Sequence, residues 1–231
     1  MIDLHTHILP QMDDGSKSVE ETAALLMQLR QQGVTTVVAT PHFYPKEENP
    51  QIFLERREKA LSQVVLPEGG PEKLLVGAEV AYFSGIGSSD ALEKLRIGDT
   101  RLLLIEMPFA DWSDWMISDI CEISDQQGLI PVLAHINRYH GRNQFPRFMN
   151  TLAASGVLFQ CNAEAFSGFR SRRLALNLLK NGNIHFLGTD CHNLTNRPPL
   201  MGMAQQEIIK KLGMVFLRKF DKNAETLLSL R

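Results

Sequence analysis

The stretch Ile2-Asp3-Leu4-His5-Thr6-His7 joins a short apolar run to two histidines that are separated by one residue. Because side chains alternate along a strand, a strand over this run places His5 and His7 on the same face. Two neutral imidazoles at a strand end form a chelating pair, and histidine is the commonest metal ligand among side chains. An isolated pair of this kind is more often two exposed histidines. The pair therefore indicates a metal site only if further metal-binding side chains occur elsewhere in the chain.

Including this stretch, seven short apolar runs alternate with segments of helical periodicity. The runs lack polar alternation, as expected for parallel strands that are covered on both faces. Strands and helices in alternation indicate parallel βα units. An open doubly wound sheet is one arrangement of such units, but seven units in about 200 residues favour a barrel. We therefore predict an α/β fold, a TIM-like (β/α)7 barrel, with strands over residues 2–4, 35–40, 74–80, 102–105, 129–134, 157–161 and 184–188.

The first predicted helix shows how the helices are delimited. Ser18 and Glu21 form a capping box, and Gly33 ends a helix that covers residues 19–32. Its spacing predicts one buried face made of Ala23, Leu26, Met27 and Arg30. Further helices are expected over residues 51–65, 113–127, 144–154 and 170–180, and two or three short ones after residue 200.

The overall composition limits the function. The length suits one domain over residues 1–231, and 44% hydrophobic with 22% charged residues is typical of a soluble globular protein. A net charge of −2 gives no support for binding nucleic acid, and no apolar run approaches the roughly 18 residues of a membrane span. Three widely spaced cysteines and the lack of a visible secretory signal predict reduced thiols and a cytoplasmic location.

Side chains that bind metal ions recur at the ends of the predicted strands. Each has an ordinary structural explanation when it is taken alone, for example a core histidine at His42 or a helix cap at Glu106. In a barrel, however, the carboxyl ends of all strands meet at one mouth. Unpaired carboxylates buried there are costly without a compensating cation. Six of the seven strands supply a potential ligand, which predicts a metal centre made of His5, His7, His42, Glu79, Glu106, His135, Asp190 and His192.

The residue types narrow the choice of metal. Imidazoles mixed with carboxylates, without thiolate, suit Mn²⁺, Fe²⁺ or Zn²⁺ and argue against a structural zinc site. Asp14, in the polar loop after His7, can also reach the mouth and raises the number of ligands to nine. Nine side chains exceed what one ion can hold, so we expect two or three divalent ions. Their residual positive charge would attract a phosphate.

The motifs around these residues resemble those of the polymerase and histidinol phosphatase (PHP) superfamily, in the same order along the chain. They are Met1-Ile-Asp-Leu-His-Thr-His7, Asp13-Asp14-Gly15, Ala-Thr-Pro-His42, Gly-Ala-Glu79, Ile-Glu106-Met-Pro, Ala-His135-Ile-Asn-Arg138 and Gly-Thr-Asp190-Cys-His192. Within the superfamily, the chain looks like the manganese-dependent protein-tyrosine phosphatases of bacterial capsule and exopolysaccharide synthesis. The resemblance covers essentially the whole chain.

This resemblance implies a distorted (β/α)7 barrel of the PHP type that holds a trinuclear centre, with manganese as the expected metal. The implied reaction is hydrolysis of a phosphate monoester by a water that bridges the metals. Glu79 is expected to bridge two of the ions. By motif position, the three ligand sets are His5, His7, Glu79 and Asp190; Glu79, Glu106 and His135; and Asp14, His42 and His192.

The resemblance also implies two catalytic arginines and a protein substrate. Arg138 and Arg197 match positions that clamp the phosphate, and a guanidinium fork suits its oxygens. The expected partner is a phosphotyrosine protein, namely the tyrosine-rich tail of a tyrosine kinase that regulates capsule synthesis. Four aromatic residues follow ligand positions and either border an aromatic substrate or pack within loops: Phe43, Tyr44, Phe109 and Trp112.

One motif points to a different mechanism. Residues Cys191 to Arg197 satisfy C-x₅-R, the signature of cysteine-dependent tyrosine phosphatases. That mechanism needs a thiolate in a glycine-containing loop at a helix N-terminus, whereas this loop has no glycine and is followed by Pro198-Pro199. Strand alternation also turns Cys191 away from the face that bears Asp190 and His192. We therefore reject the cysteine mechanism.

Other functions use the same ligands. A histidinol-phosphate phosphatase or another small-molecule phosphatase shares them, but the Asp13-Asp14-Gly15 loop and Glu106, where many relatives have histidine, favour the tyrosine phosphatases. An exonuclease would need a basic groove, which a net charge of −2 does not indicate. A regulator that only binds phosphotyrosine is a third alternative, but no ligand position is missing.

Overall fold

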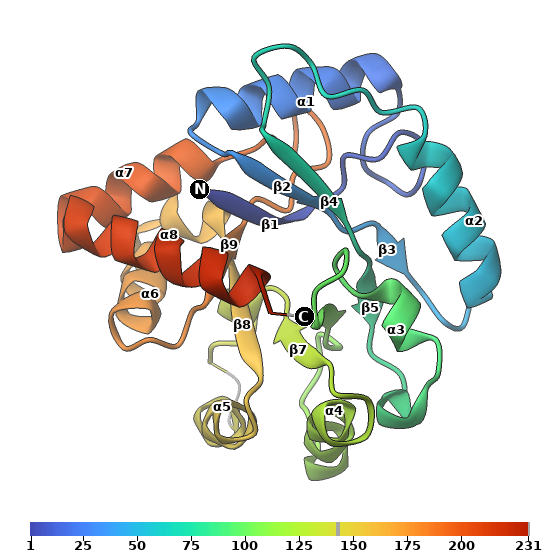
Figure 1. Ribbon diagram of the computed structural model, residues 1–231. Helices are drawn as coiled ribbons and strands as arrows, with labels where there is room; N and C mark the ends of the chain where they lie inside the picture. The colour runs from blue at the N-terminus through green and yellow to red at the C-terminus, as the bar shows by residue number, and fades with distance from the viewer. Residues whose placement is uncertain (142–143, 231) are drawn as a thin grey trace.

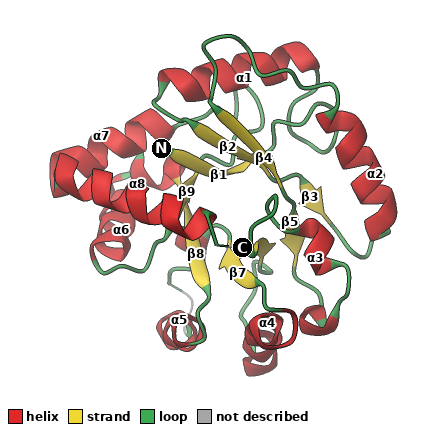
Figure 2. Cartoon of the chain, viewed as in Figure 1, coloured by secondary structure: helices red, strands yellow, loops and turns green. Residues whose placement is uncertain are grey.

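The computed structural model describes residues 1–141 and 144–230, and these form a ring of parallel strands with helices outside it (Figures 1 and 2). The strands are β1 (Ile2–Thr6), β2 (Thr36–Ala39), β3 (His42–Phe43), β4 (Lys73–Val76), β5 (Glu79–Ala81), β6 (Leu102–Glu106), β7 (Ile130–Leu133), β8 (Leu158–Asn162) and β9 (Phe186–Gly188). The helices are α1 (Val19–Gln31), α2 (Pro50–Leu61), α3 (Leu92–Leu95), α4 (Asp114–Gln127), α5 (Phe145–Ala154), α6 (Phe169–Lys180), α7 (Met201–Leu212) and α8 (Met214–Leu228). Three short 3₁₀ turns are η1 (Ile86–Ser88), η2 (Ile136–Arg138) and η3 (Ala163–Phe166).

The described strands form seven consecutive positions around the ring, because two positions are each split in two. β2 pairs with β4 and β3 pairs with β5, so β3 continues β2 and β5 continues β4. Backbone hydrogen bonds cross the breaks, from Gly77 N to Ala39 O (2.9 Å) and from Glu79 N to Pro41 O (3.0 Å). The prediction of one unbroken strand over residues 74–80 is therefore wrong, because the strand breaks at Gly77. A Cβ at Gly77 would lie 2.9 Å from Ile97 Cγ1, so the chain is closely packed at this break.

The ring closes between its first and last strands. Asp190 N donates to His5 O (2.8 Å), and His7 N donates to Cys191 O (2.9 Å), just beyond β9. On the opposite side, residues 96–98 lie between β4 and β6: Gly98 N donates to Val76 O (2.8 Å) and Ile97 N donates to Leu102 O (2.9 Å). This inserted segment distorts the ring. The predicted α/β fold, a distorted (β/α)7 barrel, is confirmed.

Helix α8 covers one end of the ring. Figure 1 shows it crossing the ring near the N-terminus, with the C-terminus close to the centre. Ala224 and Leu228 of α8 pack with the apolar side chains that fill the barrel interior, such as Leu4 and Leu104. The ammonium group of Met1 lies 3.2 Å from the Asp221 carboxylate. A larger apolar layer separates the strands from the outer helices, which leaves the carboxyl ends of the strands as the open mouth.

Several predicted helix details differ from the structure. The buried face of α1 consists of Thr22, Leu25, Leu26 and Leu29. Ala23, Met27 and Arg30 are only half-buried, because two apolar stripes compete and tertiary packing selects between them. The helix predicted over residues 51–65 ends at Leu61. After residue 200 the described chain forms two helices of ordinary length. No helix among the described residues is both long and apolar enough to cross a bilayer.

Candidate metal centre

Strand β1 presents its two histidines to the open mouth through an irregular register. Ile2 and Asp3 pair with residues 34 positions later, whereas Thr6 pairs with Ala39, so β1 carries one extra residue, as in a β-bulge. Leu4 packs in the barrel interior, and simple alternation would turn the next side chain outward. The extra residue turns His5 inward instead. His5 Nε2 and His7 Nε2 lie 3.0 Å apart, which confirms that the two histidines share a face.

The innermost part of the site joins these histidines to two carboxylates. Glu79 Oε2 lies 3.2 Å from His5 Nε2 and 3.4 Å from His7 Nε2. Asp190 Oδ1 lies 3.7 Å from His5 Nε2 and 3.4 Å from His7 Nε2. Gly188 makes room for this arrangement, since a Cβ there would lie 2.6 Å from His5 Cβ.

Glu79 also contacts the ligands from neighbouring strands. Its Oε2 lies 2.8 Å from His42 Nδ1, and its Oε1 lies 2.8 Å from His135 Nε2. Glu106 is farther out, with Oε1 at 3.8 Å from His135 Nε2. The two oxygens of Glu79 therefore face different groups of side chains, as a carboxylate between two ions would.

The outer part of the site is formed by Asp14, His42 and His192. Asp14 Oδ1 lies 3.2 Å from His192 Nε2 and 3.6 Å from His42 Nε2. Asp14 belongs to a loop that folds tightly onto β1: a Cβ at Gly15 would lie 2.0 Å from His7 O. Only glycine fits at this point, and the loop is thereby fixed where Asp14 reaches the mouth.

All nine predicted ligands lie together at the mouth. Their ligand atoms fall into four groups within 4.8 Å, namely His7, Asp14, His42 and His192; His5, His7 and Asp190; His5, Glu79 and His135; and His42, Glu79 and Glu106. The first two groups resemble two of the predicted ligand sets. The third predicted set is divided between the last two groups, which share Glu79.

Unsatisfied buried atoms show that this site fits cations. Within the described residues, Glu79 Oε2, Asp190 Oδ1 and His42 Nδ1 are buried and accept or donate no hydrogen bond of good geometry, although Glu79 Oε2 and His42 Nδ1 lie only 2.8 Å apart. Leaving such atoms unpaired is costly unless another group binds them. The donor set of imidazoles and carboxylates suits divalent transition-metal ions.

Burial and charge also shift the pKa values of these carboxyl groups. Burial alone would raise the pKa of Glu79, but the charges of His5 and His135 outweigh it and bring this pKa well below its usual range. Burial and the charge of His5 oppose each other in the same way at Asp190, whose pKa is lowered. For Glu106, burial and the neighbouring charge of Glu79 raise the pKa. A cation beside Glu106 would offset both effects.

The remaining ring nitrogens are held by residues that the sequence analysis did not identify. His7 Nδ1 lies 2.7 Å from Asp13 Oδ2, and His135 Nδ1 lies 2.8 Å from Asn162 Oδ1. Gln160 Oε1 lies 3.3 Å from His5 Nδ1 and also accepts a hydrogen bond from the backbone N of His135 (3.0 Å). Such partners fix the orientation and tautomer of a metal-binding imidazole. Gln160 and Asn162 lie on β8, the strand without a predicted ligand. Two polar residues in an otherwise apolar strand are the sequence feature that could have indicated their role.

The two predicted arginines border the same cluster. Arg138 Nη2 and Arg197 Nη2 donate to Asp190 Oδ2, at 2.8 and 2.7 Å. Arg197 Nη1 lies 2.8 Å from His192 Nε2. Both side chains are more than one-third exposed, so further guanidinium N–H groups are free to meet a ligand at the mouth.

Cys191 has no access to the mouth. Its side chain is fully buried among apolar residues, and burial raises the pKa of its thiol. The chain turns sharply beside it, with a positive φ of 55° at Asp190. A buried, protonated thiol cannot act as the nucleophile of a cysteine-dependent phosphatase. This agrees with rejecting the C-x₅-R motif.

The chain matches one protein-family model over nearly its whole length. The model of the family "Capsular polysaccharide synthesis, CpsB/CapC" matches residues 1–229. The chain belongs to the CpsB/CapC family. Among the curated proteins to which the chain is similar, the tyrosine-protein phosphatase CpsB of Streptococcus pneumoniae is 32% identical, over 92% of this chain and 91% of that protein. The tyrosine-protein phosphatase YwqE of Bacillus subtilis is 29% identical, over 99% and 91%.

The fold of this CpsB/CapC family member also matches a solved structure. A chain from the crystal structures of YwqE from Bacillus subtilis and CpsB from Streptococcus pneumoniae, described as unique metal-dependent tyrosine phosphatases, superimposes with a TM-score of 0.83. The sequence identity is 28%, and the match covers 99% of this chain and 94% of that chain. The family predicted from the motifs is thereby confirmed.

Proposed function

We propose that the protein is a metal-dependent phosphatase that hydrolyses phosphotyrosine in proteins and regulates capsule or exopolysaccharide synthesis. The observation that carries this function is the cluster of nine side chains, in which one buried oxygen of Glu79 and one of Asp190 accept no hydrogen bond. Membership of the CpsB/CapC family supports phosphotyrosine as the substrate. Residues 1–231 would act as one catalytic domain in the cytoplasm.

The proposed cofactor is a set of two or three divalent ions, with Mn²⁺ preferred over Fe²⁺ or Zn²⁺. Glu79 is the proposed bridge, because its two oxygens face different histidines. When bound, the ions would lower the pKa of a coordinated water and polarise the phosphoryl oxygens. The proposed ligands are His5, His7, Asp14, His42, Glu79, Glu106, His135, Asp190 and His192.

Arg138 and Arg197 are the proposed phosphate-binding residues. Each uses its Nη2 on Asp190 Oδ2, and Arg197 Nη1 also lies 2.8 Å from His192 Nε2. The other N–H groups remain for two phosphoryl oxygens, and such charge-assisted hydrogen bonds are the strong ones. The arginines would hold the phosphate in line for attack and offset the charge that develops on its oxygens.

The proposed partner is the phosphorylated tail of a bacterial tyrosine kinase that regulates capsule synthesis. The family model describes capsular polysaccharide synthesis, which supports a substrate of that pathway. The site itself requires only a phosphate monoester on a group that reaches the mouth.

The proposed function is tested by phosphate release from a phosphotyrosyl peptide. The protein is first stripped with a chelator, and release is measured before and after Mn²⁺ is added. We expect release only after addition, and an equal dose of Mg²⁺ tests whether the centre prefers the transition metal. Release that survives stripping would contradict the metal mechanism. No release in either state would exclude phosphotyrosine, and histidinol phosphate would then be tested as the substrate.

A further inference from the structure

A groove of about 650 Å³ opens beside the outer ligands of the metal centre. Asp14 and His42 belong to its lining, and Met12 and Ile52 contribute apolar side chains to it. Tyr44 lines the groove as well. A phosphate ester bound at the centre must direct its organic group into open space, and this groove supplies such space next to two of the proposed ligands.

The ring of Tyr44 is held over the site on one face. It stacks on the imidazole of His42, with ring centroids 5.2 Å apart and an interplanar angle of 25°. Tyr44 follows His42 by two residues and is 38% exposed. Within the described part of the chain, its hydroxyl forms no hydrogen bond and no second ring stacks on it. One face of the Tyr44 ring thus packs against His42, while part of the ring stays exposed to solvent.

The other aromatic residues near ligands do not share this position. Phe43 is buried against Phe53, at 5.0 Å between ring centroids, and Trp112 is buried against Tyr139 at 4.7 Å. Phe109 is exposed, but its ring lies 6.3 Å from that of Tyr139, which lines a different pocket. Of these four aromatic residues, only Tyr44 lines the groove beside the metal centre.

We propose that Tyr44 forms an aryl-binding subsite, in which the phenyl ring of a phosphotyrosine packs against the open part of its ring. Two aromatic rings attract each other in offset or tilted arrangements, beyond the burial of their area. A flexible alkyl ester gains no such ring contact. The groove therefore selects aryl over alkyl phosphate monoesters. This inference rests on the proposed phosphotyrosine function and adds the residue that recognises the ring.

Non-hydrolysable ligands test the subsite without relying on turnover. Binding of phenylphosphonate and methylphosphonate to the Mn²⁺-loaded protein is measured by calorimetry, for the wild type and for Tyr44→Ala. We expect Tyr44→Ala to weaken phenylphosphonate about three- to tenfold, the range of one aromatic pair, and to leave methylphosphonate unchanged. Tyr44→Phe, which keeps the ring, should bind phenylphosphonate like the wild type.

Two controls separate recognition from a structural effect on His42. Metal content is measured for each variant, because Tyr44 touches a proposed ligand. Trp115→Ala removes another exposed ring, 56% exposed on α4 and outside the groove, and should change neither affinity. An equal loss of both phosphonates in Tyr44→Ala, or a loss of metal, would overturn the subsite. Unchanged phenylphosphonate binding would overturn it as well.

Turnover separates this inference from the proposed function. If the wild type releases phosphate from a phosphotyrosyl peptide and Tyr44→Ala raises KM without lowering kcat, both stand. If the wild type releases phosphate and Tyr44→Ala has the same KM, only the aryl subsite fails. If the metal-loaded wild type releases none, the proposed function fails and the inference falls with it.

Discussion

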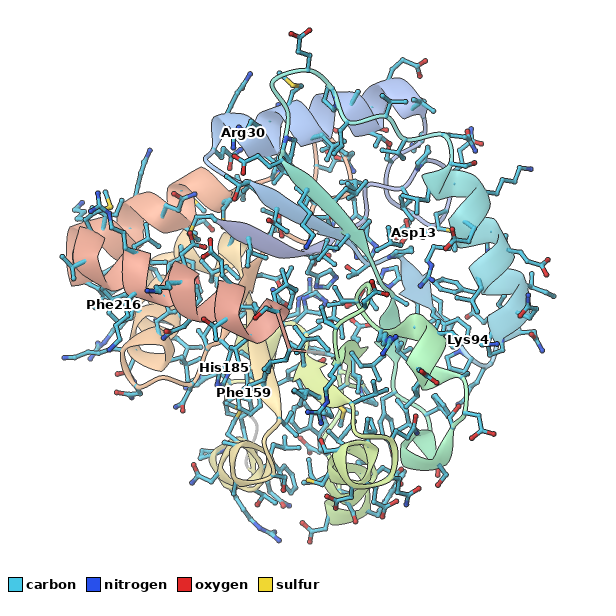
Figure 3. All side chains as sticks on the ribbon, in the orientation of Figure 1. Asp13, Arg30, Lys94, Phe159, His185 and Phe216 are labelled. Atoms are coloured by element: carbon cyan, nitrogen blue, oxygen red, sulfur yellow. The ribbon has the colours of Figure 1, made fainter. Side chains whose placement is uncertain are left out.

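At the scale of single residues, the metal centre depends on side chains that contact the proposed ligands without being ligands themselves. Asp13 is the clearest case, and Figure 3 labels it beside the strand ends. Its Oδ2 lies 2.7 Å from His7 Nδ1 and accepts a hydrogen bond from His42 N at 3.0 Å. One carboxylate thus orients one ligand and anchors the strand that carries another. Of these two neighbouring aspartates, the sequence predicted a ligand role only for Asp14.

Replacing Asp13 by asparagine should weaken the metal centre without removing a ligand. We expect Asp13→Asn to lower metal affinity about 10- to 100-fold, the usual cost of losing such a partner. Competition with a chelator of known affinity measures the change. Asp90→Asn, at an exposed loop position, is the matched control and should have no effect. Equal affinities for Asp13→Asn and the wild type would show that His7 needs no orientation.

Cys191 provides a test of mechanism at the same scale. Because its thiol is buried and its pKa raised, we expect Cys191→Ala to retain most of the Mn²⁺-dependent activity. The native protein should also resist inactivation by iodoacetamide. Cys161→Ala, at another fully buried cysteine, controls for the loss of packing. Near-total loss of activity in Cys191→Ala, with metal content intact, would restore the cysteine mechanism.

At the scale of elements, strand ends are set by contacts that local sequence does not reveal. One such contact lies between β8 and β9. His185 precedes β9, and its Nδ1 accepts a hydrogen bond from Phe159 N of β8 (3.1 Å). Figure 3 labels His185 and Phe159 side by side, with ring centroids 5.8 Å apart. Burial lowers the pKa of His185 below its ordinary value of 6.5. The folded protein therefore binds a proton at His185 less readily than the unfolded chain does.

The lowered pKa of His185 predicts a pH dependence of the stability of the folded protein. Below pH 6.5 the unfolded chain protonates His185 more readily than the folded chain, so its contribution to stability is lost as the pH falls. We expect the Tm difference between pH 7.5 and 5.5 to be smaller in His185→Gln, which keeps an acceptor but does not titrate. Thermal unfolding of both proteins at equal Mn²⁺ concentration measures this. An identical pH dependence in the two proteins would contradict the prediction.

At the scale of the whole molecule, the two ends of the barrel have separate tasks. α8 closes one end with apolar side chains, and the ligands occupy the other. Stability and metal binding should therefore respond to different substitutions. The break between β4 and β5 separates an exposed to half-buried stretch of strand from the more deeply buried stretch that carries Glu79.

A single substitution in α8 tests whether stability and metal binding are separate. Leu228 is 9% exposed and packs in the barrel interior, so Leu228→Ala should destabilise the protein by about 2–3 kcal/mol. Urea unfolding measures this loss. Metal content and activity should remain those of the wild type, because the ligands lie at the opposite end. Leu230→Ala, at a residue 37% exposed, should cost much less. Loss of metal in Leu228→Ala would show that the two ends are coupled.

The residue pattern determined the class of fold and the chemistry of the site. Parallel strands that alternate with helices bring all carboxyl strand ends to one mouth, so the ligands could be named before their distances were known. The tertiary structure decided the register of β1 that turns His5 inward, the closure between His5 and Asp190, and the exposure of Tyr44 beside the buried Phe43. The physical reason is that periodicity is local, whereas register, closure and burial depend on contacts between residues far apart in the chain.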